Sequence, residues 1–290
     1  VLCATLLGTS GCGGGEPRVP VTPDPVDTGL HLPIEDYLLT GKQAKDLADA
    51  RMVLALSCLD RFDIERPLIP KPRTSFRPGD TSIVVNPARR YGVLDPEVVS
   101  RYGYHPEPGT YPDLTTSAEP ELTRTAALVL HGDEEHPDRR VRVHGRTVPD
   151  GGCLGEAQRR LGGRPGVYGD SSLAAELNVN SFAVTRDDPR VRAAIDAWSA
   201  CMRVAGHPQT DPLEALGQGK PSVRPTATRQ EIAVATADLA CKRSTRLAAV
   251  WAQAEREYQE AAIRAKSDEF AQITVDLATQ VSRAEAALDR

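Results

Sequence analysis

The sequence predicts a mainly helical protein that is held together by two disulfide bonds. Over several stretches of the 290-residue chain, apolar side chains recur every three to four positions, which places them on one face of a helix. Strand-like patterning is confined to one short region, and four of the six cysteines lie in the helical part. We therefore expect a helical domain with two disulfides, a small β-hairpin and a long C-terminal helix or helical hairpin.

The composition excludes several classes of protein. Hydrophobic residues make up 40% and charged residues 26% of the chain, as in globular proteins. No stretch holds the roughly 18 consecutive apolar residues of a membrane-spanning helix. The net charge of -5 removes the electrostatic attraction on which nucleic-acid-binding proteins depend. We expect no nucleic-acid partner.

The first 12 residues are typical of the end of a bacterial lipoprotein signal peptide. An apolar run over residues 1–7 continues through small residues to Cys12, directly after Ser10 and Gly11. In the lipobox pattern such a cysteine is lipidated and becomes the first residue of the mature chain. Thr9 stands where the pattern prefers Leu. Because no Met or basic segment precedes the run, residues 1–12 are interpreted as a truncated signal peptide with a lipobox; a plain secretory signal that contains a cysteine is the alternative.

A lipidated Cys12 would place the protein on the extracytoplasmic face of the cell membrane. Two acyl chains, at about 0.8 kcal/mol per buried methylene, anchor a protein stably without a spanning helix. Residues 13–33 are rich in Gly and Pro and poor in apolar side chains. We predict that they form a flexible tether between the lipid and the folded domain.

The other four cysteines of the mature chain are Cys58, Cys153, Cys201 and Cys241. Four cysteines in an exported domain indicate two disulfides, with three possible pairings. The helical stretches that end at Cys58 and Cys201 are alike, and each is followed by a cysteine that opens or continues a helix. If this similarity is a structural repeat, the pairs are Cys58 with Cys153 and Cys201 with Cys241. Free thiols conflict with export, and a zinc site normally has Cys-x-x-Cys spacing, which is missing.

Residues 34–225 are assigned to one disulfide-bonded domain of helices and loops. Apolar positions recur at helical spacing from Ile34 to Leu59. Proline directly after aspartate predicts helices that begin at Pro96 and Pro189. The helix from Pro189 has an apolar stripe that we expect to be buried: Val191, Ile195, Trp198 and Met202.

A β-hairpin is predicted from the apolar runs 127–130 and 140–143, which flank a polar segment. Candidate metal ligands gather there: His131, Asp133, Glu134, Glu135, His136 and His144. Imidazole with carboxylate is a suitable ligand set for zinc. Consecutive charged side chains at a hairpin tip are usually just solvated, however. We expect neither a metal nor a cofactor.

Residues 226–290 are predicted to form a long C-terminal helix or helical hairpin. There is no Pro or Gly after Pro225, and Thr228 and Glu231 have the spacing of a capping box. Near the C-terminus, apolar residues alternate three and four positions apart, as in a coiled-coil seam. The seam consists of Phe270, Ile273, Leu277, Val281, Ala284 and Leu288.

Two interpretations of this seam remain open. In the first, the helix breaks near residues 267–268 and folds back on itself or on the first helix. In the second, it is a projecting arm that pairs with an envelope protein or a second copy of the chain. The residues that would then bind the partner are Phe270, Ile273, Leu277, Val281 and Leu288.

Ser171 is a candidate nucleophile. It lies in a Gly-Asp-Ser-Ser-Leu segment, residues 169–173, which invites comparison with the Gly-Asp-Ser-Leu esterases. In that family a later Asp-x-x-His completes the triad, but here Asp133 and His136 precede the serine. Ser171 is more simply explained as the start of a helix. An envelope hydrolase that uses Ser171, Asp133 and His136 is the alternative to a non-enzymatic protein.

Several short motifs together resemble a set of uncharacterised lipoproteins of actinobacteria. Besides the lipobox, they are Tyr91-Gly92-Val93, Gly103-Tyr104, residues 152–157 (GCLGEA), residues 198–202 (WSACM) and Ala240-Cys241-Lys242. The chain departs from that set at Leu59, where Met is common, and at Asp63, where Gly is usual. The resemblance implies an accessory role beside an envelope export system and assigns no catalytic residue. We therefore expect a membrane-anchored, non-enzymatic binding or assembly module of the cell envelope.

Overall fold

The computed structural model describes residues 30–65, 89–105, 122–136, 139–214 and 226–289. These residues form a mainly helical body with one small two-stranded sheet, as predicted. The elements are η1 Pro33–Tyr37, α1 Gly41–Asp60, α2 Pro96–Tyr102, α3 Arg124–His131, β1 Arg142–Val143, β2 Arg146–Thr147, α4 Gly152–Leu161, α5 Ser172–Thr185, α6 Pro189–Val204, α7 Arg229–Thr245, α8 Leu247–Ala265 and α9 Ser267–Leu288.

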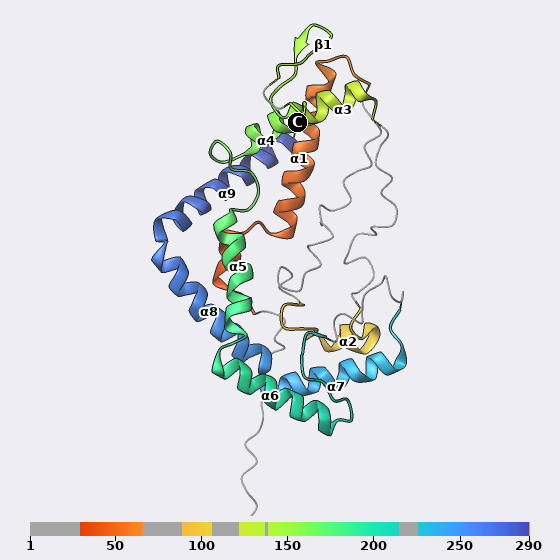
Figure 1. The fold of residues 1–290 in the computed structure, drawn as a ribbon, viewed down its shortest axis with the longest axis vertical. Coiled ribbons are helices and arrows are strands. Elements are labelled where there is room, and N and C mark those ends of the chain that lie inside the picture. Colours follow the sequence, from red (N-terminus) through yellow and green to blue (C-terminus); the bar gives the residue numbers. More distant parts are fainter. Residues whose placement is uncertain (1–29, 66–88, 106–121, 137–138, 215–225, 290) are drawn as a thin grey trace, which may run out of the picture.

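Two lobes lie at opposite ends of the molecule (Figure 1). The hairpin lobe consists of α1, α3, α4, the β1–β2 hairpin and the C-terminal half of α9. The α6–α7 lobe consists of α2, α6, α7 and the first half of α8. Helices α8 and α9 run along one side and connect the lobes, with α5 beside α8 and η1 in contact with α5, α8 and α9.

Each lobe has its own apolar core. In the hairpin lobe, side chains of α1 pack against α3, α4 and the end of α9 around Leu54, Leu59 and Cys153. In the α6–α7 lobe, Trp198 and Trp251 lie at the centre of the core. A smaller cluster between the lobes joins η1, α5 and the start of α9.

Both helix starts predicted from Asp-Pro are confirmed. Helix α2 spans Pro96–Tyr102, and Asp95 accepts a hydrogen bond from the Glu97 amide at 2.8 Å. Helix α6 begins at Pro189, and Asp188 accepts from the Arg190 amide at 2.8 Å. In the predicted stripe of α6, Val191, Trp198 and Met202 are buried, while Ile195 is only partly buried.

The helix expected from Ile34 to Leu59 is divided in two. The 3-10 helix η1 ends at Tyr37, and α1 begins at Gly41 after Thr40. Thr40 accepts a hydrogen bond from the Gln43 amide, and the Gln43 side chain accepts one from the Thr40 amide. This capping box satisfies amides that a continuous helix would have bonded to its own backbone, so it starts a new helix. Leu32, which lies in the predicted tether, is packed in the structure and is 2% exposed.

The predicted hairpin was wrong in its first strand. Residues 124–131 form α3, because the side chain of Thr123 caps the Ala126 amide and the buried positions have helical spacing. The strands that pair are β1 and β2, with Arg142 opposite Thr147 and Val143 opposite Arg146. His144 and Gly145 between them both have positive φ, at 46° and 77°, as a two-residue hairpin turn of this kind requires.

The C-terminal region is three helices and neither a single long helix nor a projecting arm. It breaks at Arg246, which has left-handed φ of 55°, and again at Lys266, next to the break expected near residue 267. Helix α9 then packs along α1 and also contacts α4. Of the predicted seam, Phe270, Ile273 and Leu277 are buried inside the molecule.

Candidate functional sites

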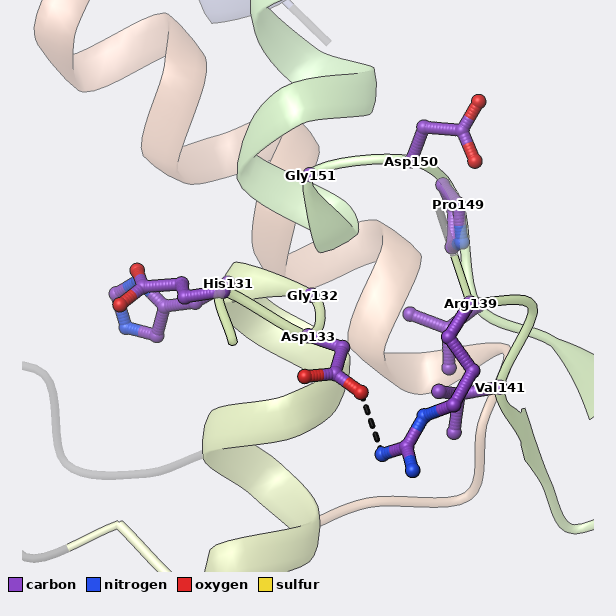
Figure 2. Close-up of a pocket in the computed structure, with 10 residues that line it drawn as sticks. His131, Gly132, Asp133, Arg139, Val141, Pro149, Asp150 and Gly151 are labelled. Atoms are coloured by element: carbon purple, nitrogen blue, oxygen red, sulfur yellow. Dashed lines mark ion pairs between the residues drawn. The ribbon is translucent and has the colours of Figure 1, made fainter. Parts of the chain in front are cut away.

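Three of the predicted metal ligands of the hairpin region, His131, Asp133 and Glu134, line a pocket of about 190 Å³ (Figure 2). The other candidates, Glu135, His136 and His144, are not part of its lining. The end of α3, the hairpin and residues 149–151 before α4 surround it. Ligand sites for drug-sized molecules are usually about 300–1,000 Å³. The pocket is therefore small for an organic substrate.

Within this pocket, the Asp133 carboxylate is already paired with a cation. Figure 2 shows Asp133 and Arg139 pointing toward each other and forming an ion pair, while His131 extends in another direction. The Asp133 carboxylate also accepts a hydrogen bond from the His136 amide at 3.0 Å. Although desolvation raises the pKa of Asp133, this amide and the Arg139 guanidinium lower it more. Asp133 is thus an ionised carboxylate that shapes the loop.

The other candidates of this region do not converge on a metal. His144 lies at the hairpin turn, where its Nδ1 donates to the Phe62 carbonyl at 2.7 Å. Arg146 donates to the neighbouring Arg61 carbonyl. Both side chains therefore satisfy carbonyls at the C-terminal end of α1, where positive charge is also favoured by the helix dipole. In the described ranges, no group of three or more His, Cys, Asp and Glu side chains could hold a metal ion.

Ser171 occupies the N-cap position of α5, although its side chain makes no capping hydrogen bond. Its neighbour Asp170 accepts from the Leu39 amide at 2.7 Å, and the Gly169 amide donates to Gln280 at 2.6 Å. Burial raises the pKa of Asp170 despite that hydrogen bond. Among the described residues, no hydrogen bond joins Ser171 to a histidine. The segment attaches the α4–α5 loop to its surroundings and supplies no base for the serine.

The most extensive polar cluster of the described residues was not predicted. Arg90 forms two hydrogen bonds with the Glu255 carboxylate, at 2.8 and 2.6 Å, and both side chains are almost fully buried, at 3% and 0% exposure. Glu255 also accepts from the Tyr91 hydroxyl at 2.6 Å and from the Ser181 hydroxyl at 2.8 Å. Arg90 donates in addition to Asn178 at 2.9 Å.

In this Arg90–Glu255 cluster, the buried carboxylate is bonded to the guanidinium and to two hydroxyl groups. Burial raises the pKa of Tyr91, and the Glu255 carboxylate beside it raises that pKa further, so the phenol stays protonated. Removing one partner of a buried ion pair leaves an uncompensated charge, which makes such a pair structurally demanding. The cluster fixes the segment that begins at Arg90 to α5 and α8.

A second buried ion pair lies on α7. Lys242 donates to Asp238 at 2.7 Å, and both side chains are 1% exposed. The indole of Trp198 donates to the other oxygen of Asp238 at 2.8 Å, which ties α6 to α7. Gly92 lies directly over the Lys242 ammonium: a Cβ there would be 2.2 Å from Nζ, and the φ of 98° also favours glycine. Burial, with the nearby Asp238 carboxylate, raises the pKa of Tyr104.

Glu231 has a different role from the one predicted. Thr228 does cap the Glu231 amide at 3.1 Å, but the Glu231 side chain does not bond back to Thr228. It accepts instead from the Tyr104 amide at 3.1 Å and from Nδ1 of His105 at 2.8 Å. The second half of the capping box is thus replaced by a tertiary contact that holds the end of α2 on α7.

The two predicted disulfides are present. Cys58 is bonded to Cys153 and Cys201 to Cys241, each with Cα atoms 5.6 Å apart. The first bond joins α1 to α4 in the hairpin lobe, and the second joins α6 to α7 in the other lobe. Each lobe therefore has one disulfide between two of its helices.

The predicted partner-binding seam is mostly occupied by the chain itself. Phe270, Ile273 and Leu277 pack against η1 and α5, so they are not free to bind a partner. Val281 is partly buried, and Leu288 is 39% exposed. A partner surface on α9 would have to lie outside the first three of these residues.

Cys12 and the whole of the predicted signal peptide lie outside the described residues. Within the described ranges, none of the helices combines the length and the apolar character needed to cross a membrane. No protein-family model, no curated protein and no solved structure matches the chain. The similarity to actinobacterial lipoproteins therefore stays a prediction from the motifs.

Proposed function

We propose that the protein is an extracytoplasmic lipoprotein, anchored to the cell membrane through Cys12, that serves as a non-enzymatic binding or assembly module of the cell envelope. The observation that carries the proposal is the pair of disulfides, one in each lobe. Disulfides of this kind persist in oxidising compartments outside the cytoplasm. The lipobox-like Ser10-Gly11-Cys12 supplies the route to that compartment and the means of attachment.

The state of the polar groups favours binding over catalysis. The buried ion pairs Arg90–Glu255 and Asp238–Lys242 are enclosed and fully bonded, which suits them to hold helices in place. Ser171 has no hydrogen-bonded histidine among the described residues. A two-lobed body with a disulfide in each lobe is a suitable framework for contacts with other envelope proteins, such as the components of an export system that the motifs imply.

The anchor is tested by replacing Cys12 with Ala in the full-length protein with a complete signal peptide. We expect the Cys12→Ala variant to move from the membrane fraction to the medium, because the acyl chains have lost their attachment point. The matched control is Cys3→Ala, which lies within the signal and should leave the protein in the membrane fraction. Membrane retention of Cys12→Ala would refute the lipid anchor.

The non-enzymatic role is tested by a fluorophosphonate probe, which labels activated serines covalently. We expect no labelling of the purified protein at Ser171, because no histidine of the described residues is hydrogen-bonded to this serine to activate it. Ser172→Ala is the control for nonspecific labelling of the same segment. Labelling that is lost in Ser171→Ala and kept in Ser172→Ala would replace the binding module with the hydrolase alternative.

A further inference from the structure

The two disulfides differ in access to solvent. Cys58 and Cys153 are 3% and 0% exposed inside the hairpin-lobe core. Cys241 is also buried, at 2%, but its partner Cys201 is only partly buried. Cys201 is thus the one disulfide-bonded cysteine of the described residues that is not buried in a core.

The neighbours of Cys201 leave this sulfur open. Its Sγ lies 3.8 Å from the hydroxyl oxygen of Ser244, a small and exposed residue on α7. Ala200, which precedes Cys201 on α6, is small and exposed as well. Thiol–disulfide exchange depends on which sulfur can be attacked and on access to it. Small side chains at both positions favour attack at Cys201.

Basic side chains follow both cysteines of the α6–α7 disulfide in the sequence. Arg203 and Arg243 each follow a cysteine of the α6–α7 lobe by two positions, are exposed and have no acidic partner in the described part of the chain. In the hairpin lobe, Glu156, three positions after Cys153, is instead paired with Arg61 at 2.6 Å. Charges interact over about 10 Å at 0.1 M salt. An attacking thiolate is thus attracted to the α6–α7 disulfide.

Opening this bond does not require the lobe to unfold. Helices α6 and α7 remain joined by the hydrogen bond from Trp198 to Asp238. Met202, next to Cys201, is completely buried in the same core. The bond can therefore open and close while the packing around it persists.

We propose that Cys201–Cys241 is a thiol–disulfide exchange site whose reaction partner is an extracytoplasmic dithiol. A partner thiolate attacks Sγ of Cys201, a new sulfur–sulfur bond forms, the Cys201–Cys241 bond breaks, and its electron pair leaves on Cys241 as a thiolate. The second thiol of the partner then displaces Cys201. The partner is oxidised to a disulfide, the protein is reduced by two electrons, and the released thiolates are in protonation equilibrium with water.

The test is reduction of the native protein with dithiothreitol, followed by alkylation at successive times and peptide mapping. We expect Cys201 and Cys241 to be alkylated at least about tenfold faster than Cys58 and Cys153, because only the Cys201–Cys241 bond includes a cysteine outside the buried cores. Near-ultraviolet circular dichroism recorded in parallel should keep its native signal while the Cys201–Cys241 bond is reduced. Equal rates, a faster Cys58–Cys153 bond, or reduction only together with unfolding would overturn the proposal.

Two controls separate accessibility from intrinsic reactivity. In urea-unfolded protein the two disulfides should react within a fewfold of each other, since the fold no longer shields either. The double variant Arg203→Glu and Arg243→Glu should slow reduction by glutathione, whose net charge is negative, more than reduction by neutral dithiothreitol. An unchanged ratio of the glutathione and dithiothreitol rates would contradict the role of Arg203 and Arg243. A tenfold preference for Cys201–Cys241 that persists in urea would contradict the role of the fold.

Discussion

Each of the two lobes contains one disulfide bond, but the side chains in their cores differ. In the hairpin lobe, the disulfide lies in an apolar core, and the described parts of α1, α3 and α4 contribute no buried charged side chain. In the α6–α7 lobe and its junction with α5, the core is interrupted by the Arg90–Glu255 and Asp238–Lys242 ion pairs. We relate this difference to the segments that each lobe keeps in place.

The α6–α7 lobe keeps a short segment in place. Residues 89–105 contain only the two-turn helix α2, and they are attached through Arg90 to Glu255, through Gly92 over Lys242 and through His105 to Glu231. Apolar contacts are not directional, whereas hydrogen bonds between charged groups specify orientation. The comparison indicates that α1, α3 and α4 are positioned by apolar packing, whereas the short segment is positioned by buried polar bonds.

Removing each disulfide should have the largest effect on stability. The Cys58→Ser and Cys153→Ser double variant should lose about 4.7 kcal/mol of unfolding free energy, and the Cys201→Ser and Cys241→Ser variant about 3.9 kcal/mol, because the linked positions are 95 and 40 residues apart. Urea denaturation followed by far-ultraviolet circular dichroism measures both. A larger loss for the second pair would show that native packing, and not loop length, determines the contribution.

Breaking the Arg90–Glu255 pair should rank next. Glu255→Gln keeps the shape of the side chain but leaves a buried guanidinium without its counter-charge, which costs about 3–5 kcal/mol. The control is Glu260→Gln on the same helix, whose pair with Arg264 is exposed and should contribute no more than about 1 kcal/mol. Similar losses for the two variants would contradict the assignment of the buried cluster to segment fixation.

The inward and outward faces of α9 should respond differently to truncation. Leu277→Ala removes a side chain that is 9% exposed and should cost about 2–4 kcal/mol. Val275→Ala, on the face that is 58% exposed, should change stability by less than about 0.5 kcal/mol. Thermal unfolding of the two variants measures the contrast, and a small effect of Leu277→Ala would revive the projecting-arm interpretation.

The smallest expected effect concerns acid. The folded protein lowers the pKa of Asp133 in one lobe, through the balance described above, and of Asp188 in the other, chiefly through hydrogen bonds from Arg190. A carboxyl whose pKa is lower in the folded state stabilises the fold above its unfolded pKa, near 4, and loses that contribution as the pH falls through the folded value. Asp133→Asn and Asp188→Asn should each flatten the acid side of a plot of stability against pH. An unchanged acid limb would show that these ion pairs do not persist in solution.

Local signals in the sequence predicted much of the fold. Asp95 and Asp188 before proline fix helix starts, because capping and the restricted φ of proline operate within a few residues. The cysteine pairing followed from the similarity of two helical segments. The first strand of the hairpin was mispredicted because a four-residue apolar run is compatible with either a helix or a strand, and Thr123 as a cap decides between them.

Features that depend on distant contacts were not predictable in this way. Arg90 and Glu255 are 165 positions apart, and neither has a sequence neighbour that indicates a buried partner. Arg246 interrupts the C-terminal helix without any glycine or proline to mark the break. Polar residues on the buried faces of apolar helices, such as Asn178 and Ser181 on α5, are the signal that could have indicated the cluster.

The positions of the two disulfides also determine how the chain would respond to mechanical force. A pull on its two ends can stretch the residues outside the covalent loops, but the 95-residue and 40-residue separations stay closed. At about 3.4 Å per extended residue, the bonds withhold on the order of 450 Å of contour length. Opening Cys201–Cys241 alone would release roughly 130 Å of it. The α6–α7 lobe would then lengthen under load, while the Cys58–Cys153 bond would still prevent the hairpin lobe from extending.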